Sequence, residues 1–403
     1  MGMYAPGYYL DLKTLAEVRG IPFEKFRSGL GQQEMAVTPP DEDAVTMGAA
    51  AALEALEGIP PASIDTIMFA TESGIDQSKA AALYLHRLIG LSPTCKAFEL
   101  KQACCSSTMA LLMATSLVKD SPDRRVLVVA SDVARYDTAS PGEPTQGAGA
   151  IAFLVSADPR LLVLDTAVGS HTEDVMDFWR PNYRETACVD GKYSIRVYLH
   201  TLGKSWKRYE KAGGYPFEDI NYFCYHLPFT NMGSKAHASL AKIAGHDHLA
   251  PRALRRAVLP GLIYNRRIGN TYTASLYLSL LSLLDHAPPG LAGGRVALFS
   301  YGSGSMGAFF SGRVMPSYRR QLDPRRHKRI LSRRIQLTIE AYHDMRDYAL
   351  PCDGSTIKTP RCTTGPFRLA GIAEHKRIYE STATANVTPD VLRHGLSGRV
   401  CAV

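Results

Sequence analysis

The sequence predicts an α/β protein built from two copies of one unit. Short apolar strands alternate with helices along most of the 403 residues. One strand, 126–130, is apolar throughout, as in sheets that are covered on both faces. The same order of strands, helices and Gly-rich turns then recurs in the second half. A duplicated unit of sheet and helices is therefore the expected architecture.

The first copy follows from the apolar pattern. An alanine-rich helix is expected over 43–56, a buried strand over 66–70 and a helix over 78–88. Glu72 lies just beyond the strand. Another apolar helix begins after Cys104 and strand 126–130 follows it. The Gly-rich segment 147–150 leads into a last strand, 151–155.

The second copy repeats this order. Strand 222–225 ends at His226 and is followed by a helix over 234–244. Asn270 opens an apolar helix over 272–281, and a strand, a Gly-rich turn and another strand follow. We expect an N-terminal half, a C-terminal half with an insertion that has no counterpart in the first, and a tail of little periodicity. The N-terminal half covers 1–160, the C-terminal half covers 161–350 with the insertion at about 161–214, and the tail covers 351–403. The last ~20 residues of the tail have a composition typical of disorder.

Superposing the two copies places Glu72 opposite His226 and Cys104 opposite Asn270. Ligands of α/β folds collect beyond the carboxyl ends of the strands, so these four side chains are expected to face one cleft. Each also has a structural explanation, such as a helix cap for Glu72 or a turn residue for Asn270. Their coincidence at equivalent points of a duplicated unit favours a catalytic site.

Cys104 is the most informative of the four residues. It lies at the start of a helix, where the backbone N–H groups and the helix dipole favour a thiolate and lower a thiol pKa. A thiolate can attack a thioester, a carboxylate can remove the α-proton, and an imidazole can protonate an alkoxide. An asparagine and backbone N–H groups can hold an oxyanion. Together these groups would join two thioesters through a carbon–carbon bond. The alternative is a small buried residue beneath a helix.

Nine segments resemble, in order, the 3-hydroxy-3-methylglutaryl-CoA synthase family, most closely the bacterial type. They are 70–74, 101–104, 131–136, 142–149, 177–181, 189–191, 226–229, 269–275 and 300–304. The resemblance runs from about residue 4 to residue 348. It implies the thiolase-like fold, in which two duplicated βαβαβ halves form a layered αβαβα architecture, and a homodimer.

The resemblance also implies roles for individual residues. Cys104 would be acetylated by acetyl-CoA, and Glu72 would deprotonate the acetyl methyl group. The enolate would attack acetoacetyl-CoA while His226 acts as the acid, giving 3-hydroxy-3-methylglutaryl-CoA for the mevalonate route to isoprenoids. No metal and no cofactor beyond the CoA thioesters is implied. Further residues implied to contact substrate or CoA are Thr145, Ser194, Lys235, Asn270 and Ser303, with Asp132, Tyr136 and Asp177 in support.

Three features depart from the family pattern. Cys105 stands where the family usually has an aromatic residue, and Asn231 stands where it often has a lysine. The segment before Met3 is shorter than the family's first strand. The second of these departures puts the affinity for CoA in question and keeps an acyl carrier protein open as a partner.

Three other functions fit part of the pattern. A related synthase installs β-branches on polyketides that are bound to an acyl carrier protein. An initiating ketoacyl synthase shares the Cys, His and Asn but does not need Glu72. A non-catalytic paralogue would keep only the fold as an interaction surface.

Composition and charge limit the class of protein. The net charge is +8, and eight Lys and Arg with a single acid fall between Arg319 and Arg334. A solvated basic face is favoured there over a site for a polyanion, so nucleic acid is not expected, although an acidic carrier protein stays open. The eight cysteines lack zinc-ligand spacing. There is no apolar run of about 20 residues and no signal-peptide pattern, which predicts a cytoplasmic protein that does not cross a membrane.

Overall fold

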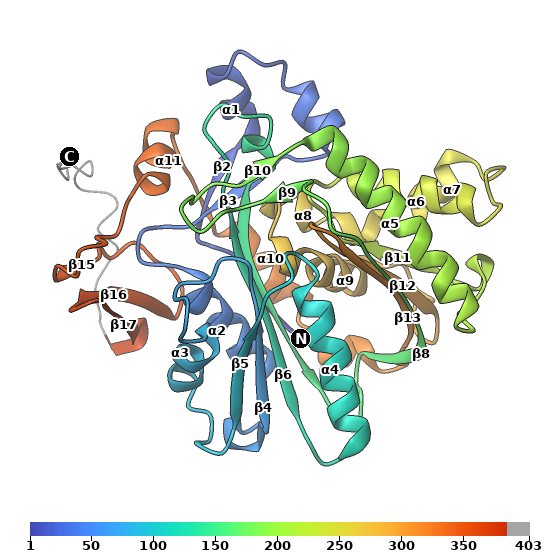
Figure 1. Cartoon of the computed structure of the whole chain (residues 1–403), viewed down its shortest axis with the longest axis horizontal. Helices are drawn as coiled ribbons and strands as arrows, with labels where there is room; N and C mark the ends of the chain where they lie inside the picture. Colours follow the sequence, from blue (N-terminus) through green and yellow to red (C-terminus); the bar gives the residue numbers. More distant parts are fainter. Residues whose placement is uncertain (385–403) are drawn as a thin grey trace.

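Two central sheets carry the fold in the computed structural model, which describes residues 1–384 (Figure 1). The first sheet has the order β1 (Gly2–Tyr4), β7 (Gly147–Val155), β6 (Val126–Ala134), β4 (Thr66–Ala70) and β5 (Lys96–Leu100). Strands β6, β4 and β5 run parallel to one another, and β7 runs antiparallel to both of its neighbours, β6 and β1. The second sheet has the order β8 (Leu162–Thr172), β13 (Met306–Val314), β12 (Arg295–Gly302) and β11 (Tyr222–Tyr225).

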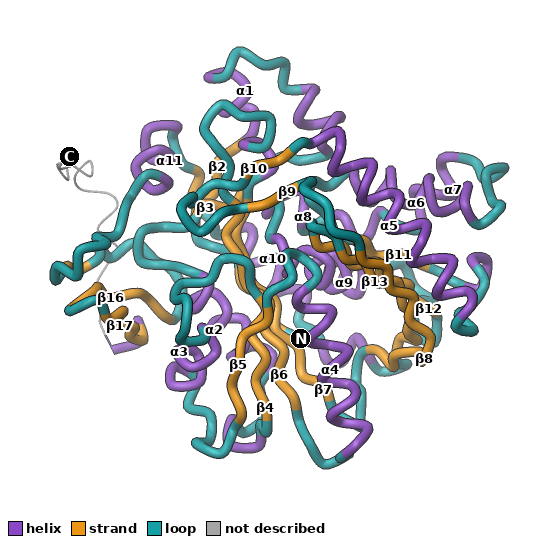
Figure 2. Tube along the Cα trace, in the orientation of Figure 1, coloured by secondary structure: helices purple, strands orange, loops and turns teal. Residues whose placement is uncertain are grey.

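Helices cover both sheets and separate them, as Figures 1 and 2 show. The middle layer holds α4 (Ser106–Asp120) and α9 (Ser275–His286), whose apolar residues share one core with strands of both sheets. Thr108 and Tyr277 join these two helices through their hydroxyl groups at 2.9 Å. The outer layers hold α2 (Ala44–Ala55) and α3 (Ala81–Leu88) on one side and α5 (Gly191–Lys211) and α6 (Met232–Ile243) on the other. The predicted αβαβα layering is confirmed.

The start of α2 shows how the sequence sets a helix boundary. The Asp43 carboxylate accepts hydrogen bonds from the amides of Val45 and Thr46, and the Thr46 hydroxyl accepts one from the Asp43 amide. This reciprocal cap satisfies amides that have no partner within the helix. The alanine-rich face of α2 then packs closely against β7 and β1.

The prediction that 161–214 is an insertion without a counterpart is wrong for most of its length. Strand β8 pairs with β13 as β1 pairs with β7, and α5 covers β8 as α2 covers β1. The equivalence escapes the sequence because β1 has 3 residues and β8 has 11. Only the stretch between β8 and α5, which includes the short pair β9 (Phe178–Trp179) and β10 (Cys188–Val189), has no counterpart.

The short β1 forms one edge of the first sheet. Gly2 pairs with Ala152 of β7 and lies directly against α2. A Cβ atom at Gly2 would come within 2.5 Å of the Ala51 carbonyl oxygen, so only glycine fits this approach.

Two small sheets flank the N-terminal half. One has the order β14 (Ile335–Gln336), β2 (Tyr8–Asp11) and β3 (Glu34–Val37), and α1 (Leu12–Val18) and α11 (Ile339–Arg346) lie beside it. The other lies in the tail, with the order β15 (Ile357–Lys358), β16 (Phe367–Ala373) and β17 (Lys376–Ser381). The buried Arg368 pairs with Asp41 at 3.1 Å and fixes this sheet near the start of α2. The predicted disorder of the last ~20 residues falls outside the described residues.

The remaining helices lie on the C-terminal half. They are α7 (Pro251–Arg256), α8 (Asn265–Ile268) and α10 (Pro324–Ser332), with short 3-10 turns between elements and one turn of π-helix at Lys25–Leu30. Across residues 1–384 no helix combines the length and apolar character that a membrane span requires.

Candidate active site

The site lies where strands and helices of both halves end. Glu72 follows β4 and His226 follows β11, while Cys104 precedes α4 and Asn270 precedes α9. Cys104, His226 and Asn270 line one cavity of about 390 Å³, and Glu72 reaches it through Cys104. The predicted convergence of the four residues is therefore present.

The nucleophile candidate contacts the base candidate directly. The Cys104 thiol donates to a Glu72 carboxylate oxygen at 2.9 Å. Ala103, just before the cysteine, has φ of +43°, a strained value for a residue with a side chain, and this turn sets where Cys104 projects. Gly302 packs against the same turn, where a Cβ atom would lie 2.5 Å from the Gln102 carbonyl oxygen.

The expected lowering of the Cys104 pKa is wrong for the protein without substrate. Burial and the nearby Glu72 carboxylate raise the pKa of Cys104 well above its usual value. Burial, together with the charge of Asp132, raises the pKa of Glu72 to about 8. The short distance to a carboxyl group in a buried site outweighs the helix terminus, so both groups keep their protons near neutral pH.

Asp132 holds the Glu72 segment in place. One of its oxygens accepts from the amides of Glu72 and Ser73, both at 2.9 Å, and from the Thr71 hydroxyl at 2.7 Å. The other oxygen accepts from the amide of Thr273, near the start of α9, at 3.1 Å. Burial raises the pKa of Asp132 to about 6 despite these hydrogen bonds. Asp132 thus ties the base segment of one half to the other half.

His226 is held by Ser275. Its Nδ1 lies 2.7 Å from the Ser275 hydroxyl oxygen, which also accepts from the Leu227 amide at 3.1 Å. The hydroxyl can donate its own proton to Nδ1, and in that tautomer the ring proton sits on Nε2. Burial lowers the pKa of His226 to about 3, so the ring is neutral and presents one N–H donor.

Asn270 and Tyr136 line the same cavity as the Cys104 thiol. The Asn270 side-chain oxygen accepts a hydrogen bond from the backbone N–H of Tyr272 at 2.9 Å. The backbone N–H of Asn270 donates to the Thr145 carbonyl oxygen at 3.0 Å. Tyr136 interacts with the side chains of Asn270 and Tyr272 and lines the cavity. The asparagine amide group is thereby fixed within reach of a ligand.

Asp177 organises the Gly-rich turn that follows β12. Its carboxylate accepts from the Tyr301 hydroxyl at 2.7 Å, the Gly304 amide at 2.9 Å and the Ser194 hydroxyl at 2.9 Å. Ser303, which lies between two of these contacts, therefore faces the cavity on a braced turn.

The other predicted site residues fall into three positions. Thr145, Ser194 and Ser303 line the cavity, as do Tyr136 and Asn270. Asp132 and Asp177 are fully buried behind it. Lys235 is exposed on α6, outside the lining residues, with its ammonium 4.9 Å from the ring centre of Phe229, which does line the cavity.

Sequence reasoning missed several residues of the site. Ser275, the partner of His226, lies 49 positions away from it, and no spacing rule links the two. Arg184 and Cys188 line the cavity, and an Arg184 nitrogen lies 3.2 Å from the Cys188 sulfur. Both lie in the connection between β8 and α5, within the segment for which the sequence predicts only an insertion.

The two departures near the site have structural roles. Cys105 is fully buried, and burial raises its pKa to about 11, whereas Cys104 lines the cavity. The Asn231 amide donates to the carbonyl oxygens of Ser28 and Gly29 at 2.6 and 3.2 Å. Asn231 therefore joins the start of α6 to the π-helical turn, at the place where a lysine was expected.

One cluster in residues 1–384 has metal-ligand composition, namely His171, Glu173 and His200. Nδ1 of His171 lies 2.5 Å from an Arg208 nitrogen, which can only donate. The ring proton is therefore on Nε2, 2.8 Å from Glu173. A protonated Nε2 has no lone pair for a metal, so this arrangement is a hydrogen-bonded cluster.

Comparisons with known proteins agree with this geometry. The family model "Hydroxymethylglutaryl-coenzyme A synthase N terminal" matches residues 1–159, and the C-terminal model of that family matches 162–252 and 245–347. A hydroxymethylglutaryl-CoA synthase of Enterococcus faecalis is 41% identical over 353 residues, which is 88% of this chain and 92% of that protein.

Solved structures of synthases are also similar to this chain. An HMG-CoA synthase complexed with CoA aligns with a TM-score of 0.89 at 40% identity, over 94% of this chain and 98% of that one. The HMG synthase of the curacin biosynthetic pathway, in complex with apo donor-ACP, aligns with a TM-score of 0.88 at 30% identity, again over 94% and 98%.

Proposed function

Since this chain belongs to the hydroxymethylglutaryl-CoA synthase family, we propose that its cavity condenses acetyl-CoA with acetoacetyl-CoA. The products are 3-hydroxy-3-methylglutaryl-CoA and free CoA, which makes the protein an acyltransferase of the mevalonate route to isoprenoids. The chemistry needs no group beyond the two thioesters. We place the reaction in the reducing cytoplasm, which keeps the reactive thiol of Cys104 and the neighbouring thiol of Cys105 reduced.

Cys104 begins the reaction. Its sulfur attacks the carbonyl carbon of acetyl-CoA, the bond to the CoA sulfur breaks, and CoA leaves as the thiol. Glu72 lies at the distance needed to take the proton of the thiol, and it passes this proton to the departing CoA sulfur, which leaves Glu72 as a carboxylate again. The developing oxyanion is stabilised by N–H donors that are already in place, among which the Asn270 amide is the side-chain candidate.

Glu72 and His226 then divide the condensation between them. The Glu72 carboxylate removes a proton from the acetyl methyl group, and the resulting enolate carbon bonds to the ketone carbon of acetoacetyl-CoA. His226 donates its Nε2 proton to the alkoxide that forms. Water finally hydrolyses the Cys104 thioester. Its hydroxyl group bonds to the acyl carbon, its other proton returns to His226, and Glu72 gives its proton to the Cys104 sulfur, which releases the product carboxylic acid and restores the thiol.

The contact between the Cys104 thiol and Glu72 carries this proposal. An acetyl group bound to Cys104 would lie next to the Glu72 carboxyl group. Glu72 could then remove a proton from the acetyl methyl group, as the condensation requires. The neutral imidazole held by Ser275 supplies the acid on the other side of the cavity.

A product assay tests the function. The protein is mixed with acetyl-CoA and either acetoacetyl-CoA or acetoacetyl-carrier protein, and the products are identified by mass spectrometry. We expect 3-hydroxy-3-methylglutaryl-CoA from the first mixture. Product from the carrier-bound substrate alone would replace this function by β-branching of polyketides, and failure to acetylate Cys104 would indicate a non-catalytic paralogue.

Two observations favour CoA over an acyl carrier protein as the group to which the acetoacetyl substrate is attached. The relative solved with a carrier protein is 30% identical to this chain, whereas the Enterococcus faecalis synthase and the synthase solved with CoA are 41% and 40% identical. Half of the basic run is engaged within the chain: Arg319 bonds a carbonyl oxygen, and Arg326, Arg329 and Arg334 pair with acids. Less of this charge is thus available to an acidic partner.

A homodimer is part of the proposal. Strand β5 forms the edge of the first sheet, and the helices beside it, α3 and α4, expose Leu83 and Met113. An unpaired edge flanked by apolar side chains suits pairing with a second copy. Light scattering should give twice the mass of the chain, and a monomer at micromolar concentration would contradict this part.

A further inference from the structure

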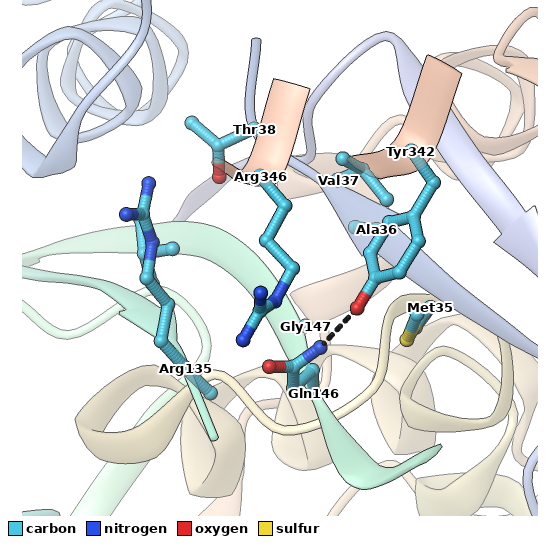
Figure 3. Close-up of a pocket in the computed structure, with 11 residues that line it drawn as sticks. Met35, Ala36, Val37, Thr38, Arg135, Gln146, Gly147, Tyr342 and Arg346 are labelled. Carbon is cyan, nitrogen blue, oxygen red and sulfur yellow. Dashed lines mark hydrogen bonds between the residues drawn. The ribbon is translucent and has the colours of Figure 1, made fainter. Parts of the chain in front are cut away.

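A second, smaller cavity lies behind the substrate cavity, between β3, the end of β6 and α11 (Figure 3). Its volume is about 30 Å³, above the roughly 10–15 Å³ that one water needs and suited to a small ion. Its polar lining comes from Thr38, Arg135, Gln146, Tyr342 and Arg346, and none of its lining residues is acidic.

Two donors on this cavity have no partner within residues 1–384. The Thr38 hydroxyl is buried and unpaired, on a residue that is only 7% exposed, and Nε of Arg346 is likewise buried and unpaired. A buried donor without an acceptor costs about 1–3 kcal/mol, more when it is charged. These two donors therefore point to a ligand that accepts hydrogen bonds.

The charges around the cavity are poorly compensated. Within residues 1–384 Arg135 has one ion-pair partner, Glu185 at 3.7 Å, and that glutamate is 84% exposed. Arg346 pairs with Asp347 at 2.7 Å, and Asp347 is 58% exposed. Burial and the charge of Arg346 lower the pKa of Arg135, with Glu185 acting in the opposite sense. Two guanidinium groups thus share a partly enclosed space in which water could accept hydrogen bonds but could not balance charge.

Figure 3 shows how the three side chains are arranged. Arg135 and Arg346 run in opposite directions, with the Arg346 guanidinium group near Gln146, and Thr38 lies above Arg346 in this view. Gln146 is already occupied, because its amide donates to the Tyr342 hydroxyl at 2.8 Å. The groups left to bind a ligand are therefore the Thr38 hydroxyl, Nε of Arg346 and the Arg135 guanidinium group.

We propose that this cavity is a binding site for a small monovalent anion of the size of chloride or bromide, held by Thr38, Arg135 and Arg346. The site adjoins the substrate cavity through Tyr136. Arg346 donates to the Tyr136 carbonyl oxygen at 2.7 Å, and the Tyr136 side chain lines the substrate cavity. An anion bound here fixes the backbone behind that wall.

Thermal unfolding in two salts tests binding without any substrate, so its outcome is independent of the proposed condensation. Sodium gluconate is replaced by sodium chloride at constant ionic strength, because gluconate is too large for the cavity. An anion that binds the folded chain raises the unfolding midpoint, here by about 1 °C or more. An equal midpoint in the two salts would overturn the proposal.

Two variants and a matched control locate the effect. Thr38→Val removes only the unpaired hydroxyl, so it should fold normally and lose the chloride-dependent shift, and Arg346→Lys should lose it as well. Thr201→Val makes the same change at another buried threonine whose hydroxyl is unpaired, on α5, and should keep the shift. A shift that survives in Thr38→Val would place the anion elsewhere and refute the site.

Bromide gives a direct view. Crystals grown in sodium bromide should show an anomalous peak between the Thr38 hydroxyl and the two guanidinium groups. An ordered water in that position, with no anomalous signal, would overturn the proposal.

Discussion

A single oxygen of Asp132 accepts hydrogen bonds from the amides of Glu72 and Ser73, each at 2.9 Å. The same carboxylate therefore sets the position of the base segment and raises the pKa of the Glu72 side chain, to which burial contributes more. Position and proton affinity of the base are controlled by one buried group.

Replacing Asp132 by asparagine should move the pH profile of turnover. Activity that needs ionised Glu72 rises with pH through about 8 in the wild type. Without the negative charge of Asp132, the Glu72 pKa falls, and the rising limb moves to lower pH by about one unit. Asp120→Asn, at an exposed position on α4, should leave the profile in place. A limb that stays in place in Asp132→Asn would show that Asp132 acts only as a support.

Glu72→Gln should separate acetylation from condensation. The amide keeps the shape of the side chain but cannot remove the methyl proton, so turnover should fall by about 10²–10⁴-fold. Intact-protein mass spectrometry with acetyl-CoA should still detect the acetyl adduct on Cys104. Turnover close to that of the wild type would exclude Glu72 as the base.

The adjacent cysteines test the register of the nucleophile. Cys104→Ser should abolish turnover, because the family's chemistry passes through a thioester, and the protein should gain no stable acetyl group. Cys105→Ala should keep most of the activity and lose about 1 kcal/mol of stability from a small cavity. The opposite pair of results would assign the nucleophile to Cys105.

Ser275→Ala should weaken His226 without removing it. The imidazole loses the partner that holds its ring and its tautomer, so kcat should fall by about 10-fold or more while acetylation of Cys104 persists. Ser279→Ala is the matched control, since this buried serine lies one turn further along α9. In a His226→Asn background, Ser275→Ala should cause little further loss of turnover. A further loss as large as that of Ser275→Ala alone would show that the two residues act independently.

His327 predicts a pH dependence of stability. Nδ1 lies 2.6 Å from Asp285 and Nε2 lies 2.9 Å from Glu54, which joins α10 to α9 and α2. Burial alone would lower the His327 pKa, but these two carboxylates raise it to about 9. A histidine with a raised folded-state pKa stabilises fully below its unfolded value of about 6.5, and the contribution is lost as pH rises through about 9.

The size of that contribution is on the order of 3 kcal/mol. The urea midpoint of the wild type should therefore fall between pH 6.5 and pH 9.5. In His327→Gln the midpoint should be lower at pH 6.5 and change less over this range. Parallel profiles for the two proteins would show that the charge of His327 does not contribute.

Much of the fold and the central site could be predicted from the sequence. Apolar runs and glycine turns report local backbone preference, so the strands and helices of both halves were expected close to where they lie. Polar residues directly after strands, such as His226, and a cysteine before an apolar helix follow from the same local pattern. The duplication then set which of them face one another.

Contacts between distant residues were decided only by the tertiary structure. The pairing of Arg368 with Asp41, 327 positions apart, holds the tail sheet near the start of α2, and no local pattern encodes it. The Cys104 pKa depends on burial and on the distance to Glu72, so its direction could not follow from the helix terminus alone. The unpaired Thr38 hydroxyl indicates a binding site only because Arg135 and Arg346, from other parts of the chain, line the same cavity. Periodicity is a property of neighbouring residues, whereas dielectric environment and charge balance are properties of the packed molecule.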